Sequence, residues 1–270
     1  MKRKKVGIVF GGGGAKSFAH LGVVKVFEEN DIPIDVLTTC SGGSIIGALI
    51  ACGISIEDIK KEFYKFTKKL SWLRPNMSTK GFLSQKNIRS ILYHLCGNKN
   101  IEDLNISLSI VATNLSKGEL KIFNKGNLIE AVCASSAFPG IYKPVEINGE
   151  LYVDGGVLDS VPADVCRNIV GNDNVVISIS LDESLQEIDK NNVFSIVHKS
   201  IYIPILKRRQ QIINENSDIN INIFEDRPFN INNWRDILRF YSERKMEYFF
   251  RKGEIEANKV VNDIKKLIYE

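Results

Sequence analysis

The chain has 270 residues, of which 44% are hydrophobic and 25% charged, and its formal net charge is +4. This composition is that of a globular protein with a sizeable core, and the charge falls short of a nucleic-acid-binding profile. No stretch approaches the roughly 18 uninterrupted apolar residues of a membrane span, so any lipid is expected to be met at a surface.

Cysteine usage predicts a reducing compartment. The five cysteines form no CxxC pair, and an odd number suits free buried thiols, which predicts a cytoplasmic protein. The basic residues 1–5 resemble the start of a signal peptide, but the apolar run Val6–Phe10 is too short for its hydrophobic region.

The first 53 residues predict two β-α units. Residues 5–10 form a short apolar run without polar alternation, typical of a strand covered on both faces, and Gly11–Gly14 end it. Apolar residues then recur at spacings of three and four, which predicts an amphipathic helix that closes near Pro33. Val36–Thr39 is expected to be the second buried strand, followed by a helix of small residues over 45–53.

The middle of the chain predicts two scaffold helices and then a mixture of strands and helices. Ser55 with Asp58 resembles a capping box, and Ser84 is expected to start another helix. The expected strands are 107–112, 119–123 and 175–181, with a hairpin over 144–153 that turns at Asn148-Gly149. The expected helices are 128–137 and one that begins at Pro162, a good first-turn residue.

From about Phe194 the sequence is helical and basic, with one expected strand over 219–224. No repeat, low-complexity segment or Pro/Gly-rich linker divides the chain. The sequence therefore predicts a single domain over 1–270, a three-layer α/β/α fold with a largely parallel central sheet. Its motifs lie in residues 5–182, and its helical basic part is 194–270.

A serine lies between the second expected strand and its helix. Thr39-Cys40-Ser41-Gly42-Gly43 resembles the G-x-S-x-G turn that exposes a nucleophilic hydroxyl, with Thr39 in place of the first glycine. Ser41 could instead be an ordinary N-cap. Three residues later, Ser44 is the nearest competing nucleophile, but Ile45 and Ile46 place bulk where such a turn needs small residues.

The glycines after the first strand predict an anion site, because their amides face outward at a helix N-terminus. The anion could be a phosphate, a pyrophosphate or a tetrahedral oxyanion. Aligned as a P-loop on Lys16-Ser17, the sequence lacks both framing glycines, and a G-x-G-x-x-G fingerprint ends at Lys16 or Ser17. An oxyanion hole asks only for unobstructed N–H donors, which Gly12, Gly13 and Gly14 would supply.

An aspartate at the end of an expected strand is the third candidate. Asp154 follows Tyr152-Val153 and precedes Gly155-Gly156, and these glycines would allow another segment to approach closely. Asp-Gly-Gly could equally be a simple turn.

Six motifs in a fixed order then carry a resemblance. They are Gly12-Gly13-Gly14-Ala15-Lys16, Ala19-His20-Leu21-Gly22-Val23, the pentapeptide around Ser41, Val111-Ala112-Thr113-Asn114-Leu115, Ala134-Ser135-Ser136-Ala137-Phe138-Pro139 and Val153-Asp154-Gly155-Gly156. In this order and spacing they make residues 5–182 resemble the patatin-like phospholipase family. The sequence departs from the family pattern at Thr39 and Ser17, each of which replaces a glycine.

The resemblance implies a serine acyl hydrolase that acts on lipid esters through a Ser41–Asp154 dyad, with an oxyanion hole from the glycine loop and with neither metal nor cofactor. A conventional triad would need a histidine after the acid, and only His198 qualifies, on an expected helix. His20 and His94 are expected to be packing or surface residues. Two different functions stay open: a nucleotide-binding module that uses the glycine loop, and a catalytically impaired lipid-binding scaffold, which Thr39 suggests.

The segment Trp234–Arg251 offers two interpretations. Its aromatic and aliphatic residues recur at helical spacing among several arginines and lysines. Such a helix can lie at a membrane interface and give peripheral contact with anionic lipid. The stronger interpretation is that this apolar stripe packs on the domain's own sheet.

Overall fold

The computed structural model describes residues 3–68, 85–183, 193–225 and 241–270. Its strands are β1 (Val6–Phe10), β2 (Val36–Cys40), β3 (Ser107–Asn114), β4 (Glu119–Phe123), β5 (Val145–Ile147), β6 (Glu150–Asp154), β7 (Val175–Glu183) and β8 (Ile219–Glu225). Its α-helices are α1 (Phe18–Glu29), α2 (Gly42–Ala51), α3 (Ile56–Lys68), α4 (Lys86–Cys96), α5 (Leu128–Ser135), α6 (Ala163–Val170), α7 (Val193–Asn216) and α9 (Glu243–Tyr269). Short 3-10 turns are η1 (Gly14–Ser17), η3 (Ile101–Asp103) and η4 (Gly155–Val157).

The eight strands of the described residues form one sheet. Its strand order is β5-β6-β3-β2-β1-β7-β8, and β4 also pairs with β3. The five strands from β3 to β8 along this order are parallel, whereas β4 and β6 run antiparallel to β3. The prediction of a largely parallel sheet is confirmed. Because β1 and β2 are parallel neighbours, the segments that follow them meet at one edge of the sheet, where α/β proteins bind their ligands.

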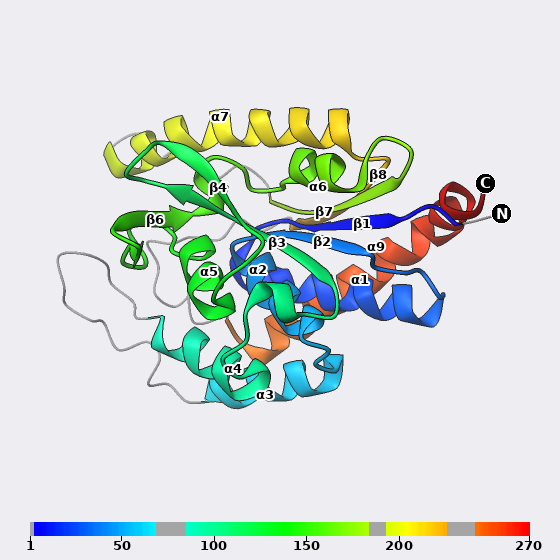
Figure 1. The fold of residues 1–270 in the computed structure, drawn as a ribbon, viewed down its shortest axis with the longest axis horizontal. Coiled ribbons are helices and arrows are strands. Elements are labelled where there is room, and N and C mark those ends of the chain that lie inside the picture. Colours follow the sequence, from blue (N-terminus) through cyan, green and yellow to red (C-terminus); the bar gives the residue numbers. More distant parts are fainter. Residues whose placement is uncertain (1–2, 69–84, 184–192, 226–240) are drawn as a thin grey trace.

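The strand β1 is covered on both faces, as its unbroken apolar run predicts. Ile8 and Phe10 are buried in the core that includes α1, α2 and α9, whereas Val9 belongs to a second core with α6 and α7. Figure 1 shows α6 and α7 over one face of the sheet and α1, α2 and α9 over the other. On the α6 side Gly7 permits close approach, because a Cβ there would lie 2.5 Å from Cys166 Sγ. The α/β/α layering is thus confirmed.

Local signals in the sequence located most elements. The turn between β5 and β6 has positive φ at both Asn148 (53°) and Gly149 (80°), the conformation that an Asn-Gly hairpin turn favours. Before α3, Ser55 Oγ accepts from the Asp58 amide at 3.1 Å, as a capping box requires. Ser84 lies outside the described residues. Pro162 immediately precedes α6 as its N-cap rather than opening its first turn.

The helix α9 crosses α1, and a glycine of each helix lies at the crossing point. A Cβ on Gly22 of α1 would lie 2.0 Å from the Phe250 carbonyl oxygen, and one on Gly253 of α9 would lie 2.0 Å from the Ala19 oxygen. The two backbones therefore touch directly. Phe249 is fully buried beside this crossing and Ala257 continues the contact face along α9.

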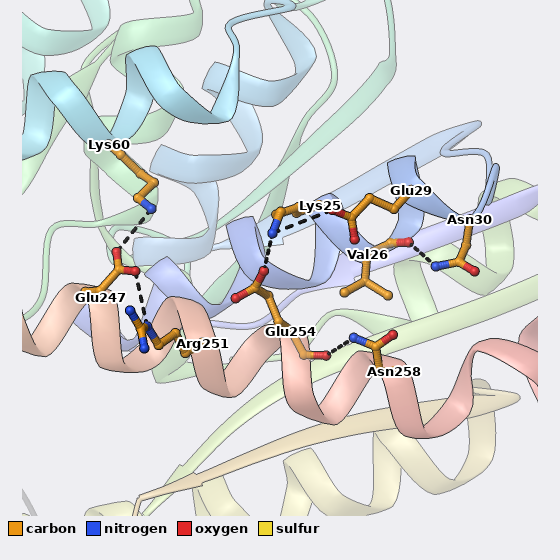
Figure 2. Close-up of polar contacts among 9 residues, drawn as sticks. All are labelled: Lys25, Val26, Glu29, Asn30, Lys60, Glu247, Arg251, Glu254 and Asn258. Carbon is orange, nitrogen blue, oxygen red and sulfur yellow. Dashed lines mark hydrogen bonds and ion pairs between the residues drawn. The ribbon is translucent and has the colours of Figure 1, made fainter.

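Charged groups frame this crossing. Figure 2 shows Glu254 of α9 paired with Lys25 of α1 at 2.5 Å, and Glu247 paired with Lys60 of α3 at 3.1 Å. Lys25 is 41% exposed in its side chain, and exposed pairs of this kind contribute about 0–1 kcal/mol. The stability of the contact therefore comes chiefly from the apolar face and the close backbone approach.

Among the described residues of Trp234–Arg251, the contacts favour core packing for Phe249, whereas Tyr248 is 38% exposed. Met246, Phe249 and Phe250 are at most 5% exposed, so they pack in the core. An interfacial role for Phe249 is therefore wrong. Trp234 and the other residues up to 240 lie outside the described residues. Across the described ranges, no helix has the length and hydropathy needed to cross a bilayer.

At the helix crossing, replacing glycine with alanine should destabilise the protein, whereas in an open helix it stabilises. In an open helix, Gly→Ala stabilises by roughly 1 kcal/mol. We expect Gly253→Ala instead to lower the free energy of unfolding by about 1–3 kcal/mol, because its Cβ would meet backbone that cannot move without parting the helices. Urea unfolding measures it, with exposed Asn258→Ala in the same helix as control. A Gly253→Ala protein as stable as the parent would show that the helices adjust freely.

All five cysteines are buried free thiols, as their number and spacing predict. Cys40 lies directly before Ser41, and burial is the main reason that the pKa of its thiol is raised, with the Asp154 carboxylate adding to the shift. A thiol held protonated in this way is a poor nucleophile. The chemistry at this edge of the sheet therefore falls to oxygen groups.

Candidate active site

Ser41 occupies a sharp turn between β2 and α2. Its backbone has φ 52° and ψ −125°, a conformation that non-glycine residues rarely adopt and that a nucleophile turn requires. Ser41 is the N-cap of α2 by position, but its side chain makes no capping hydrogen bond. Its hydroxyl instead donates to Asp154 Oδ2 at 2.5 Å. The ordinary N-cap interpretation is therefore wrong for this side chain.

The two glycines after Ser41 let the turn pass under the glycine loop. A Cβ on Gly42 would lie 2.7 Å from the Gly14 oxygen, and one on Gly43 would lie 2.5 Å from the Phe10 oxygen. Both neighbours are backbone, so neither could yield cheaply to a side chain. The start of α2 is consequently seated against the end of β1, which brings Ser41 and the glycine loop together.

Thr39, which replaces the glycine of the usual pattern, is accommodated by a glycine elsewhere. Its methyl carbon Cγ2 lies 2.5 Å from the position that a Cβ on Gly47 of α2 would occupy. Thr39 is fully buried, and the missing side chain at Gly47 provides the space for it. The threonine therefore fits between strand and helix while Ser41 keeps its positive φ.

Asp154 is held on every side at the end of β6. Its Oδ1 accepts from the Gly156 amide at 2.8 Å, its amide donates to the Ala137 oxygen at 3.0 Å, and its carbonyl accepts from Thr113 Oγ1 at 2.9 Å. A Cβ on Gly155 would lie 2.5 Å from the Val111 oxygen, so only glycine lets the chain turn here. The Asp-Gly-Gly turn is real, and it presents the carboxylate to Ser41.

Burial gives this carboxylate the basicity that proton transfer needs. Asp154 is only 2% exposed. Burial raises its pKa to about 6, and the hydrogen bonds from Ser41 and Gly156 partly oppose that rise. A carboxylate with a pKa near 6 is ionised at neutral pH and is a stronger base than an exposed aspartate. The pair can therefore activate a serine hydroxyl without a histidine.

The glycine loop, Gly11–Gly14, is hydrogen-bonded at its first peptide group, and, among the described residues, its next two amides are not. The Gly11 carbonyl accepts from His20 Nε2 at 2.9 Å, and the Gly12 amide donates to the Ser160 carbonyl at 2.9 Å. Of the three expected oxyanion donors, Gly12 is thus already engaged. Within the described part of the chain, the Gly13 and Gly14 amides have no assigned acceptor. A Cβ on Gly12 would lie 3.0 Å from Ser41 Cβ, which shows how close the loop runs to Ser41.

His20 has a structural part in this loop. It is fully buried and stacks on Phe10 with ring centroids 4.4 Å apart. Burial lowers its pKa to about 4, so the ring is neutral at neutral pH and its Nε2–H is committed to the Gly11 carbonyl. Of the remaining histidines, His94 is exposed on α4 and His198 lies in α7.

The structure brings together Ser41, Asp154 and the glycine loop as the sequence predicts, and it adds groups to which the sequence assigns no role. These are the side chains of Ser44 and Ser135, which hydrogen-bond to each other, and the Ser160 carbonyl. Ser135 lies in one of the six motifs, so the sequence drew attention to this residue. It did not reveal the hydrogen bond between Ser135 and Ser44. Among the described residues, no three His, Cys, Asp or Glu side chains gather where they could hold a metal ion.

Comparison with known proteins gives consistent matches. The family model described as patatin-like phospholipase matches residues 8–167. An uncharacterised NTE family protein of Mycobacterium bovis is 32% identical over 182 residues, which cover 67% of this chain and 50% of that protein. Lysophospholipase NTE1 of Coccidioides immitis is 32% identical over 163 residues, 58% of this chain and 10% of that protein. The chain thus spans half or less of these relatives.

The fold also matches a solved structure. VipD from Legionella pneumophila superposes with a TM-score of 0.50 at 15% identity, over 97% of this chain and 67% of that one. This likeness supports the α/β arrangement and the placement of its layers.

Proposed function

The chain belongs to the patatin-like phospholipase family, and from this premise we propose that it hydrolyses carboxylic ester bonds of lipids with Ser41 as nucleophile and Asp154 as base. The observation that carries the proposal is the hydrogen bond of 2.5 Å from Ser41 Oγ to a buried carboxylate, made from a turn with positive φ. The description of the family and the name of the Coccidioides immitis relative make phospholipids and lysophospholipids the first substrates to test.

In the proposed reaction, one carboxylate accepts a proton twice and gives it up twice. Asp154 Oδ2 accepts the hydroxyl proton as Ser41 Oγ attacks the ester carbonyl, and the negative charge develops on the carbonyl oxygen. Collapse of the tetrahedral species releases the alcohol, which takes the proton from Asp154, and leaves an acyl-serine. A water molecule then attacks this acyl group while Asp154 takes its proton, and the fatty acid leaves as Ser41 recovers its hydrogen.

The developing charge would be held by the Gly13 and Gly14 amides. They lie beyond the anchored Gly11–Gly12 peptide and have no acceptor in the described part of the chain. Amides fixed in this way need little reorganisation during the reaction, and one such donor is typically worth about 100-fold to 1000-fold in turnover. A cofactor or metal has no place in this proposal, and cytoplasmic operation with transient contact at a membrane surface stays a prediction.

Active-site labelling tests the proposal directly. We expect a fluorophosphonate to modify the intact protein at one site, and peptide mapping to place the adduct on Ser41. Among the described residues, its hydroxyl is the one that is paired with a buried carboxylate at a strained turn. The labelled protein should lose turnover of a p-nitrophenyl ester in proportion. An adduct on Ser44 or Ser136 would contradict the assignment, and an unlabelled protein that turns over no ester would favour a lipid-binding scaffold.

The pH dependence of the rate is a second test. The base works only when ionised, and its pKa is about 6. We therefore expect kcat/KM for a soluble ester to rise about tenfold per pH unit below pH 6 and to level off above it. Circular dichroism at each pH would verify that the protein stays folded. A rising limb that disappears on His198→Ala would point to a histidine base instead.

A further inference from the structure

A three-residue segment, Ser135–Ala137, contacts both members of the proposed dyad. Ser135 Oγ accepts from the Ser41 amide at 2.9 Å, and the Ala137 carbonyl accepts from the Asp154 amide at 3.0 Å. Ser41 and Asp154 come from different parts of the sequence, 113 residues apart. This segment at the end of α5 is therefore a direct physical link between them.

The contact with Ser41 supplies a partner that regular structure does not. Ser41 lies after the last residue of β2 and before the first residue of α2, so its amide has neither a strand partner nor a helical acceptor. A part-buried amide without an acceptor carries a free-energy cost. The Ser135 hydroxyl removes that cost only while Ser41 keeps its unusual backbone, and so it favours the conformation that points Oγ at Asp154.

A second serine completes the link. Ser44 Oγ lies 2.8 Å from Ser135 Oγ, and both side chains are fully buried. A hydroxyl has one donor and two acceptor positions, so Ser135 can accept from the Ser41 amide and still bond to Ser44. The Ser44 amide in turn donates to the Ser41 carbonyl at 2.9 Å, which closes the turn. Ser44, which competed as a nucleophile in the sequence, is instead enclosed by this pairing.

The segment is itself fastened to the scaffold. The Ser136 amide donates to the Val132 carbonyl at 3.0 Å, and Gln85 Nε2 donates to the Cys133 carbonyl at 2.8 Å. Arg89 of α4 forms an ion pair with Glu130 of α5, with a second hydrogen bond at 3.1 Å. The end of α5 is thus fixed by groups that touch neither Ser41 nor Asp154.

We propose that Ser135 is a positioning residue for ester hydrolysis, which acts through the Ser41 amide to hold the nucleophile within hydrogen-bond distance of Asp154. This role rests on the proposed function. It also means that the Ser41 amide is consumed by Ser135 and is no oxyanion donor, which leaves that part to the glycine loop. A misplacement of about 1 Å at a reacting group can cost about 100-fold in rate.

The test compares Ser135→Ala with Ser136→Ala, the matched control from the same segment. We expect Ser135→Ala to lower kcat and the rate of fluorophosphonate labelling by about 10-fold to 100-fold with KM unchanged, and Ser136→Ala to stay within a few-fold of the parent. Ser135→Thr, which keeps the hydroxyl, should recover part of the loss. Thermal unfolding of each variant shows which proteins are folded.

A pH profile separates positioning from mere support of the fold. The hydrogen bond from Ser41 lowers the pKa of Asp154. Ser135→Ala should weaken this bond, so the pKa of Asp154 should rise and the rising limb of kcat/KM should move to higher pH. The role of Ser135 would be overturned if Ser135→Ala left both kcat and the rising limb unchanged, or if Ser136→Ala lowered kcat equally. Labelling of the wild type at Ser41 would still support the proposed function in either case. A wild type that is not labelled at Ser41 would overturn both.

Discussion

Replacing Ser41 with alanine should lower ester turnover by about 10⁴-fold or more and abolish fluorophosphonate labelling. Loss of the nucleophile of a covalent mechanism removes the acyl-enzyme route altogether, and only binding and oxyanion stabilisation remain. Alanine keeps the size and backbone demands of the turn, so the protein should stay folded. Turnover of a p-nitrophenyl ester and of a lysophospholipid, each with thermal unfolding alongside, measures the effect.

The hydroxyls of Ser136 and Ser44 are the alternatives to Ser41 as the nucleophile. Ser136→Ala should retain near-parent turnover, since its hydroxyl is bonded to the Val132 carbonyl and contacts neither Ser41 nor Asp154. Ser44 is fully buried and paired with Ser135, so it has no access to a substrate. If Ser41→Ala kept substantial turnover, the catalytic serine would have to lie elsewhere.

Replacing Asp154 with asparagine should lower activity by about 10³-fold or more while it stabilises the protein at neutral pH. The activity falls because an amide cannot accept the Ser41 proton. The geometry is expected to survive: the asparagine carbonyl can still accept from the Gly156 amide, and its NH₂ can donate to Ser41 Oγ. Turnover should therefore vanish without loss of fold.

The gain in stability follows from the sign of the pKa shift. Folding raises the pKa of Asp154 from 3.8 to about 6, so the unfolded chain releases this proton first, and the folded state loses stability as pH rises through that interval. A shift of roughly two units corresponds to about 3 kcal/mol, present in full above pH 6. Asparagine does not ionise and avoids this penalty.

Urea unfolding at two pH values measures the shift. We expect Asp154→Asn to exceed the parent's free energy of unfolding by up to about 3 kcal/mol at pH 8 and to match it near pH 4. His198→Ala serves as the activity control and should stay within a few-fold of the parent. Equal stabilities at pH 8 would show that Asp154 is not under strain from burial. A near-inactive His198→Ala would reinstate the triad.

The parts of the fold that were predictable are those that local sequence determines. The Asn148-Gly149 hairpin needs two residues that tolerate positive φ, and the sequence supplies them side by side. The buried strands and the turn at Ser41 are likewise indicated by short runs of neighbouring residues. The pairing of Ser41 with Asp154 spans 113 residues, and only the resemblance to a known family suggested it.

What sequence could not provide depends on where distant backbone passes. The Gly12 amide is engaged because the Ser160 carbonyl lies 2.9 Å away, and no spacing in the sequence encodes that approach. Thr39 departs from the usual glycine, and its methyl group fits because Gly47, eight positions further along, has no side chain. The apolar stripe that contains Phe249 has the same periodicity whether a membrane or α1 covers it, so periodicity alone could not decide.

The two ends of the described chain lie together, and this determines where anything attached to them would project. The Lys4 amide donates to the Ile268 carbonyl at 3.0 Å, and Figure 1 shows the N and C labels side by side. Lys4 precedes β1, whereas the glycine loop and Ser41 follow the opposite ends of β1 and β2. A tag, tether or further domain joined at either end would therefore emerge on the side of the sheet away from Ser41. Immobilisation through an end of the chain should leave the proposed ester-hydrolysing site open to vesicles and micelles.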